Sequence, residues 1–116
     1  MITVVNKYKH TPTESDVYIG RGSPLGNPFT SRPITTTSAE IQADSREDSI
    51  NRYRKYIYGI LQSDSSEMYT IGKGLNEIIS KLDKHGYVNL VCFCKPKDCH
   101  GDVIKQIIED LYNNNE

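Results

Sequence analysis

The stretch 87-YVNLVCFCKPKDCHGDVIKQII-108 decides the fold of this chain. It begins with an almost continuous apolar run over 87–94, which is typical of a strand covered on both faces. A polar turn follows, and a helix is then predicted to begin between Cys99 and Gly101. The apolar positions of that helix recur at helical spacing, at Val103, Ile104, Ile107, Ile108 and Leu111. A buried strand followed by a turn and an amphipathic helix is the basic unit of α/β proteins.

Two further strands are predicted upstream, over 1–5 (MITVV) and 16–20 (DVYIG), where β-branched residues are frequent. The second strand runs into the turn 20-GRGSPLGNPF-29. The glycines and prolines of this turn exclude a helix or strand through it. Residues 30–42 are expected to be irregular and exposed.

Two helices are predicted between the second and third strands. One begins near Asp44 or Ser45, because Asp44 and Glu47 have the spacing of an N-terminal capping box. The other covers roughly 70–84. The order strand, strand, helix, helix, strand, helix predicts one α/β domain spanning 1–116. We expect a small, largely parallel sheet with helices packed on it, which resembles a truncated Rossmann-like fold.

Composition limits the classes of function. The chain has 116 residues and a net charge of −1, so it is one domain without the basic excess that favours nucleic acid as a partner. No apolar run approaches the ~20 residues that cross a bilayer, so no membrane partner is expected. The start lacks the pattern of a signal peptide. The three cysteines, an odd and clustered number, indicate reduced thiols and a cytoplasmic location.

Two turns follow predicted strands and carry polar side chains, and this makes them the candidate site. Ligands of open α/β sheets bind beyond the carboxyl ends of the strands. If the strands are parallel, 20–29 and 93–102 face each other across one crevice. A small phosphate-bearing ligand is therefore the partner that we expect there.

The first turn offers groups suited to an anion. Glycines allow close backbone approach, and successive N–H groups can form a nest for an anion. Arg21 can grip a phosphate with two parallel hydrogen bonds, and Asn27 can read a sugar hydroxyl or a base edge. The predicted ligand-binding residues here are Gly20, Arg21, Gly22, Ser23, Gly26 and Asn27. The alternative is a rigid structural turn in which Asn27 bonds its own backbone.

The second turn offers groups suited to catalysis. Cys92 is predicted to be a small core residue, whereas Cys94 and Cys99 are candidates for accessible thiols. Cys99 at a helix start can be a nucleophile, and His100 an acid or base. Asp102 can cap the helix, orient His100 or act as a base. Catalytic roles are thus assigned to Cys99, His100 and Asp102, and ligand contacts to Cys94 and Gly101. The alternative is that the cysteines only fill space.

The spacing of the cysteines argues against a metal centre. Structural zinc sites pair their ligands as C-x2-C or H-x3-H, whereas this chain has C-x-C-x4-C-H. Cys99 and His100 are adjacent, and so they reach one tetrahedral ion with difficulty. The pattern also differs from the C-x-x-C of thioredoxin-like redox proteins. We predict neither a metal nor a cofactor.

The two turns together resemble the signatures of a family of small phage and bacterial proteins catalogued only as a domain of unknown function. Its pattern runs G-R-x-S-x-x-G-N-P-F and then C-x-C-x-P-x-x-C-H-G-D. The matching positions are Gly20, Arg21, Ser23, Gly26, Asn27, Pro28, Phe29, Cys92, Cys94, Pro96, Cys99, His100, Gly101 and Asp102. The resemblance covers most of the chain. It implies that the turns form one site and names no reaction; in a phage protein, the location would be the host cytoplasm.

Three functions remain open at the level of sequence. The first is binding of a nucleotide-like or ribose-phosphate-like molecule, with a hydrolase or transferase as its enzymatic form. The second is a non-catalytic phage protein that sequesters a host signal or binds a host protein. The third is a metal-stabilised interaction module. The sequence does not indicate an oligomeric state.

Overall fold

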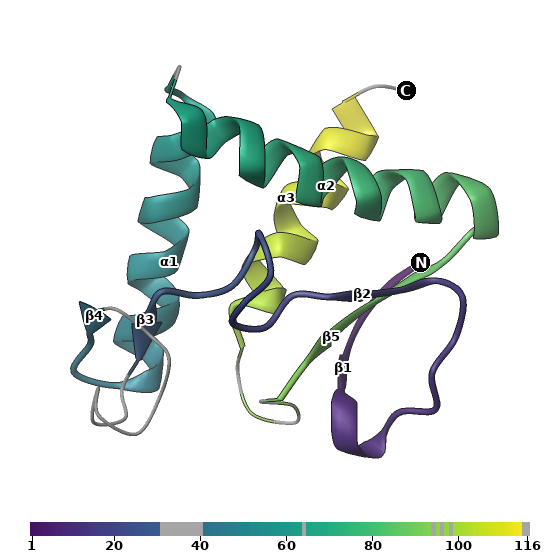
Figure 1. Cartoon of the computed structure of the whole chain (residues 1–116), viewed down its shortest axis with the longest axis horizontal. Helices are drawn as coiled ribbons and strands as arrows, with labels where there is room; N and C mark the ends of the chain where they lie inside the picture. The colour runs from purple at the N-terminus through teal and green to yellow at the C-terminus, as the bar shows by residue number, and fades with distance from the viewer. Residues whose placement is uncertain (31–40, 64, 94, 96, 98, 115–116) are drawn as a thin grey trace.

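The central feature of the fold is a three-stranded parallel sheet (Figure 1). The computed structural model describes residues 1–30, 41–63, 65–93, 95, 97 and 99–114. The strands are β1 (Ile2–Asn6), β2 (Asp16–Tyr18) and β5 (Val88–Cys92), and β5 lies between the other two. Both pairings are parallel. The predicted small α/β fold with a parallel sheet is therefore confirmed.

Helices cover one face of this sheet. Strand β5 directs Val88, Leu90 and Cys92 towards the helices, and all three are buried. On the other face, Thr3 and Tyr18 are exposed and Asn89 is half-buried. The sequence predicted cover on both faces of β5, and four of its five residues are buried, among them Val91 on this second face. The exposed positions of that face belong to the edge strands β1 and β2.

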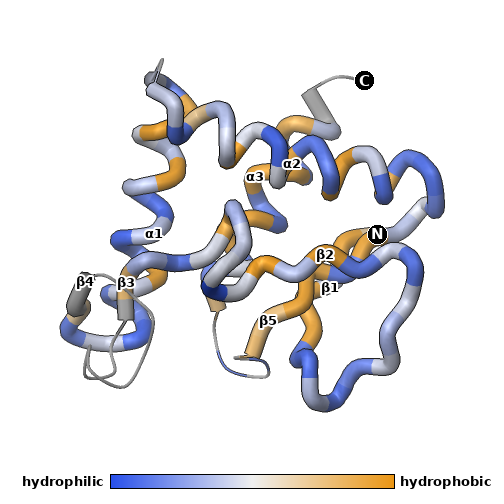
Figure 2. Tube along the Cα trace, viewed as in Figure 1, coloured by the Kyte–Doolittle hydropathy of each residue, from blue (hydrophilic) through white to orange (hydrophobic). Residues whose placement is uncertain are grey.

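The three α-helices are α1 (Arg46–Leu61), α2 (Ser66–His85) and α3 (Gly101–Asn114). Helix α2 lies across α1 and α3 in Figure 1. It begins earlier than predicted, and it ends at Gly86, whose φ of 78° is left-handed as is usual after a helix. Buried apolar side chains of the helices and strands form one core, and Figure 2 shows the hydrophobic colour along β1 and β5.

Two local predictions were wrong. Helix α1 is capped by Ser45, whose Oγ accepts a hydrogen bond from the Asp48 N–H at 3.0 Å, rather than by Asp44 and Glu47. Asp48 lies three residues after Ser45, and its side chain accepts a hydrogen bond from the Asp44 N–H at 2.9 Å. Ser45 and Asp48 together therefore satisfy two backbone N–H groups at the start of α1. In addition, β3 (Phe29–Thr30) and β4 (Ile41–Gln42) pair in parallel where irregular chain was expected. Residues 31–40 lie outside the described residues.

A carboxylate on the open face fixes the chain before β2. Asp16 accepts hydrogen bonds from the N–H and hydroxyl of Thr13 and from Asn89, and lies 3.0 Å from His10 Nε2. Burial opposes the charge of Asp16, but these hydrogen bonds outweigh it and lower the pKa from 3.8 to about 2. This network contributes to stability only while Asp16 is ionised.

We expect this contribution to disappear in acid. Because the folded pKa is the lower one, the unfolded state binds more protons between pH 3.8 and 2, and stability falls as the pH falls through that window. Solvent screening limits the loss to about 1 kcal/mol. Urea unfolding of wild type and Asp16→Asn at several pH values measures it. The variant should lack this slope, whereas Asp110→Asn, at an exposed position, should keep it.

Candidate functional site at the carboxyl edge of the sheet

The residue just before the glycine-rich turn contacts the second turn. Ile19 follows β2, and its N–H donates to Val91 O at 3.0 Å and so extends the pairing with β5. The Ile19 carbonyl oxygen lies 2.6 Å from His100 Nε2, just before α3. Since a carbonyl oxygen only accepts, Nε2 must carry the proton. His100 therefore connects the chain after β2 to the chain after β5.

His100 is held in a fixed position by its surroundings. It is only 7% exposed, and its ring meets the Tyr53 ring edge-on, with 5.0 Å between the centroids. Its Nδ1 lies 3.6 Å from the Sγ of Cys99. Tyr53, from α1, donates its own hydroxyl to Leu25 O at 2.7 Å, and burial raises the pKa of this hydroxyl so that it stays protonated. Tyr53 of α1 therefore contacts both turns, through Leu25 in the first and His100 in the second.

Backbone N–H groups at the start of α3 donate to acceptors of the same turn. The N–H groups of Gly101, Asp102 and Val103 donate to Cys99 Sγ, Cys99 O and His100 O. A Cβ on Gly101 would lie 2.8 Å from side-chain atoms of both Ile19 and Val4, so close packing on the sheet requires a glycine here. These contacts disfavour an anion at this helix start.

Asp102 acts as a cap in this structure. Its Oδ2 accepts the Cys99 N–H at 3.3 Å, and Lys95 Nζ donates to both carboxylate oxygens at 2.7 and 2.9 Å. Partial burial lowers the pKa of Lys95, but the hydrogen bond and charge of Asp102 outweigh burial and raise it. Of the roles that the sequence left open for Asp102, the geometry favours the cap.

The glycine-rich turn is closed by its own backbone. The N–H of Ser23 donates to Gly20 O, as does the Ser23 hydroxyl, and the N–H of Gly26 donates to Ser23 O. Gly22 lies at the exposed tip with a φ of 93°, in the left-handed region, and no atom approaches its Cβ position. The tip of the turn is therefore open to a ligand.

Two polar side chains of the turn also make structural contacts. Arg21 Nη2 donates to Phe29 O at 2.9 Å, which places the half-buried guanidinium across the turn. Asn27 is buried, accepts the Phe29 N–H at 2.9 Å, and donates to Ser49 Oγ on α1 at 3.0 Å. Asn27 thus holds the turn to α1, and its reading of a sugar or base remains a prediction.

The described cysteines are buried. Cys92 and Cys99 each have an exposure of 1%. The core position of Cys92 agrees with expectation, whereas Cys99 is not the accessible thiol that its place at a helix start suggested. The Ile19 and Val4 side chains that meet Gly101, and Tyr53 against His100, cover this region. Cys94 lies outside the described residues.

Residues of other kinds also adjoin the two turns. Tyr18 donates its hydroxyl to Arg21 O at 3.0 Å, and Phe93 lies 5.9 Å from the Tyr18 ring. Sequence reasoning did not single out either residue for the site. The signal that could have found them is position, since both aromatic residues stand where a strand gives way to one of the candidate turns.

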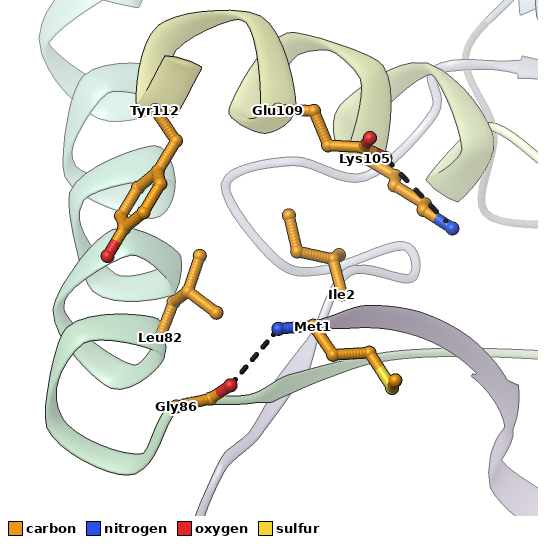
Figure 3. A pocket seen from close by; sticks show the side chains of 7 residues that line it. All are labelled: Met1, Ile2, Leu82, Gly86, Lys105, Glu109 and Tyr112. Atoms are coloured by element: carbon orange, nitrogen blue, oxygen red, sulfur yellow. Dashed lines mark hydrogen bonds and ion pairs between the residues drawn. The ribbon is translucent and has the colours of Figure 1, made fainter. Parts of the chain in front are cut away.

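A hollow of about 450 Å³ lies at the opposite end of the strands, between α2, α3 and the start of β1 (Figure 3). Its lining is Met1, Ile2, Leu82, Gly86, Lys105, Glu109 and Tyr112. Lys105 and Glu109 are an ion pair at 4.0 Å there. Because none of the predicted site residues that the structure describes lines this hollow, we place the candidate site at the carboxyl edge instead. Within the described ranges, no cluster of three or more His, Cys, Asp or Glu side chains could hold a metal ion.

The fold and the joined turns define a small open α/β protein with a polar edge. A family described as "Domain of unknown function (DUF4326)" matches residues 4–110, and the chain belongs to this family. It is also 32% identical, over 110 residues, to an "Uncharacterized 12.4 kDa protein in nrdA-td intergenic region" of Enterobacteria phage T4. That alignment covers 94% of this chain and 79% of the phage protein. No solved structure gave a significant match. Among the described residues, no helix has the length and apolar character to span a membrane.

Proposed function

We propose that this protein binds a small nucleotide-like or ribose-phosphate-like molecule at the carboxyl edge of its sheet. The observation that carries the proposal is the 2.6 Å contact between His100 Nε2 and Ile19 O, which joins the two polar turns at the ends of adjacent parallel strands. Open α/β sheets bind ligands beyond this end of their strands. The tip of the glycine-rich turn offers the exposed backbone.

The anion is best accommodated near Arg21 and Gly22. The first-turn N–H groups of α3 donate internally, and the Asp102 carboxylate beside them repels negative charge. The guanidinium of Arg21 lies instead across the other turn, where it donates to Phe29 O, and Gly22, the next residue in sequence, is exposed at the tip. A positive side chain next to an exposed left-handed glycine suits a phosphate group.

Binding without turnover fits the geometry better than catalysis. A nucleophilic thiol must reach its substrate, and Cys99 is 1% exposed. His100 already donates from Nε2 to Ile19 O, and its Nδ1 faces Cys99. We therefore put the non-catalytic form first, including the sequestering of a signal molecule in a host cell. The hydrolase or transferase form rests on one contact, the 3.6 Å between Cys99 Sγ and His100 Nδ1.

The test is a thermal-shift and calorimetric titration with ribose 5-phosphate and nucleoside monophosphates. A ligand at a hundredfold excess over its Kd stabilises the native state by ~2.7 kcal/mol. Arg21→Ala should lose most of this shift, and Arg21→Lys part of it, because lysine keeps the charge but not the two-pronged geometry. Without ligand, Arg21→Ala should cost about 1 kcal/mol, since Phe29 O loses one of its two donors and keeps the Ser49 hydroxyl.

Arg54→Ala is the matched control, because Arg54 is exposed on the face of α1. It should respond to the ligands like the wild type. The proposal fails if no sugar phosphate or nucleotide shifts the melting temperature. It also fails if Arg21→Ala and Arg54→Ala bind equally well. Release of product during the titration would favour the enzymatic form.

A further inference from the structure

Three aromatic rings gather on the open face of the sheet, at the same edge as the two turns. Phe93 follows β5 and lies 5.4 Å from Tyr8 and 5.9 Å from Tyr18, between ring centroids. We call Tyr8, Tyr18 and Phe93 the aromatic cluster. Tyr8 belongs to the short helix η1 (Lys7–Lys9), which directly follows β1 (Figure 1). Each ring therefore comes from the end of a different strand.

The cluster is exposed although it is apolar. Tyr8 is 82% exposed, Phe93 42% and Tyr18 40%. Three large rings that pack on one another and stay in water form the kind of surface that marks a binding site. A scatter of single exposed residues would need no such explanation.

A cation accompanies the rings. Lys7 Nζ lies 5.8 Å from the centroid of Tyr18 and 5.6 Å from that of Phe93. Aromatic faces combined with a lysine are the components with which proteins hold an unpaired base and its phosphate. The charge of Lys7 distinguishes this surface from a purely apolar docking patch, and it favours an anionic occupant.

The cluster is continuous with the glycine-rich turn. The Tyr18 hydroxyl donates to Arg21 O, and a Cβ at Gly20 would clash with the Tyr18 hydroxyl oxygen. Only a glycine allows the ring to pack this closely on the turn. One ligand can therefore contact the turn and the rings together.

We propose that the aromatic cluster stacks the base of a mononucleotide whose phosphate lies at the glycine-rich turn. This inference rests on the proposed function and makes it specific, because it distinguishes a nucleotide from a bare ribose phosphate. Lys7 lies beside the rings and adds positive charge for the phosphate. The face of Tyr8, the most exposed ring, is the stacking surface.

The test compares adenosine 5′-monophosphate with ribose 5-phosphate on wild type, Tyr8→Ala and Tyr8→Phe by calorimetry. Loss of one base–aromatic stack weakens binding roughly 5- to 150-fold. Tyr8→Ala should lose affinity for the nucleotide by this factor and keep its affinity for ribose 5-phosphate. Tyr8→Phe should bind both like the wild type. Since Tyr8 is mostly exposed, the alanine variant should fold.

Tyr69→Ala is the matched control. Tyr69 is 76% exposed on α2, with Lys73 Nζ 5.8 Å from its ring centroid, so it reproduces the tyrosine–lysine pair away from the site. This variant should bind the nucleotide normally. If it is impaired as much as Tyr8→Ala, the aromatic cluster is not the base site.

The remaining outcomes separate the two proposals. If the nucleotide and ribose 5-phosphate bind equally and Tyr8→Ala changes neither, base stacking is overturned while the ribose-phosphate function stands. If neither ligand binds, the proposed function fails and the stacking inference fails with it. If only a single-stranded oligonucleotide binds, in a Tyr8-dependent way, the mononucleotide assignment is wrong and the rings serve nucleic acid.

Discussion

Truncation of Leu25 to alanine should destabilise the protein by about 2–5 kcal/mol, the cost of removing a buried leucine side chain. Leu25 lies in the glycine-rich turn, yet it is only 2% exposed and packs against Gly74 of α2. A Cβ on Gly74 would lie 2.9 Å from Leu25 Cγ, so the fit is tight. The turn is thus part of the hydrophobic core.

Urea unfolding measures this change, and Leu111→Ala provides the comparison. Leu111 belongs to the apolar stripe of α3, which the sequence predicted to be buried, but it is 41% exposed, so its truncation should cost clearly less than that of Leu25, about 1 kcal/mol or less. The two variants remove the same atoms from different surroundings. Similar losses in both would mean that the turn is only loosely attached, and a loose turn could not present Arg21 and Gly22 to a ligand in a fixed geometry.

Leu25 also shows what the sequence could and could not predict. The spacing of apolar residues predicts helices and strands well, because the burial of one face of a helix or strand determines that spacing. The three helices of the described residues, the strands β1, β2 and β5, and most of the core follow from that pattern, whereas β3 and β4 do not. A lone leucine between Pro24 and Gly26 has no period, so its anchoring on α2 depends on tertiary packing and is invisible locally.

The sequence predicted which two segments follow the strands at this edge, and it predicted the roles of their residues less well. The turns that follow the parallel strands β2 and β5 lie at one edge of the sheet, where His100 of the second turn contacts Ile19, the residue before the first. Which polar side chains can still bind a ligand depends on the hydrogen-bond and ion-pair partners that they meet in the folded protein. Asn27 meets Ser49 from α1, and Asp102 meets Lys95. Such pairings join distant positions, and no local motif contains them.

The aromatic cluster was missed for a related reason. The two members that are farthest apart in the sequence, Tyr8 and Phe93, are 85 positions apart. They meet because β5 lies between β1 and β2, an order that no single segment specifies. Their exposure is also a tertiary property, because the helices cover only the other face of the sheet. Strand order therefore had to be known before these rings could be grouped.

Replacement of His100 by alanine should cost about 2–4 kcal/mol. It leaves the Ile19 carbonyl without the His100 donor, a loss of ~1–3 kcal/mol for a buried acceptor. It also leaves a space beside Tyr53, whose ring packs edge-on against the imidazole. His85→Ala, at the end of α2, is the control and should cost about 0.5 kcal/mol or less.

Hydrogen exchange tests whether His100 holds the glycine-rich turn in place or is only a buried side chain. The N–H groups of Ser23 and Gly26 close the glycine-rich turn. If His100 holds that turn through Ile19, both amides should exchange faster in His100→Ala, and those in the middle of α2 should change no more than global stability requires. His100→Gln, which retains a side-chain N–H donor, should restore part of the protection. Unchanged exchange at Ser23 and Gly26 in the alanine variant would mean that the two turns are held together by other contacts. His100 would then be free to serve as the acid or base that the sequence suggested.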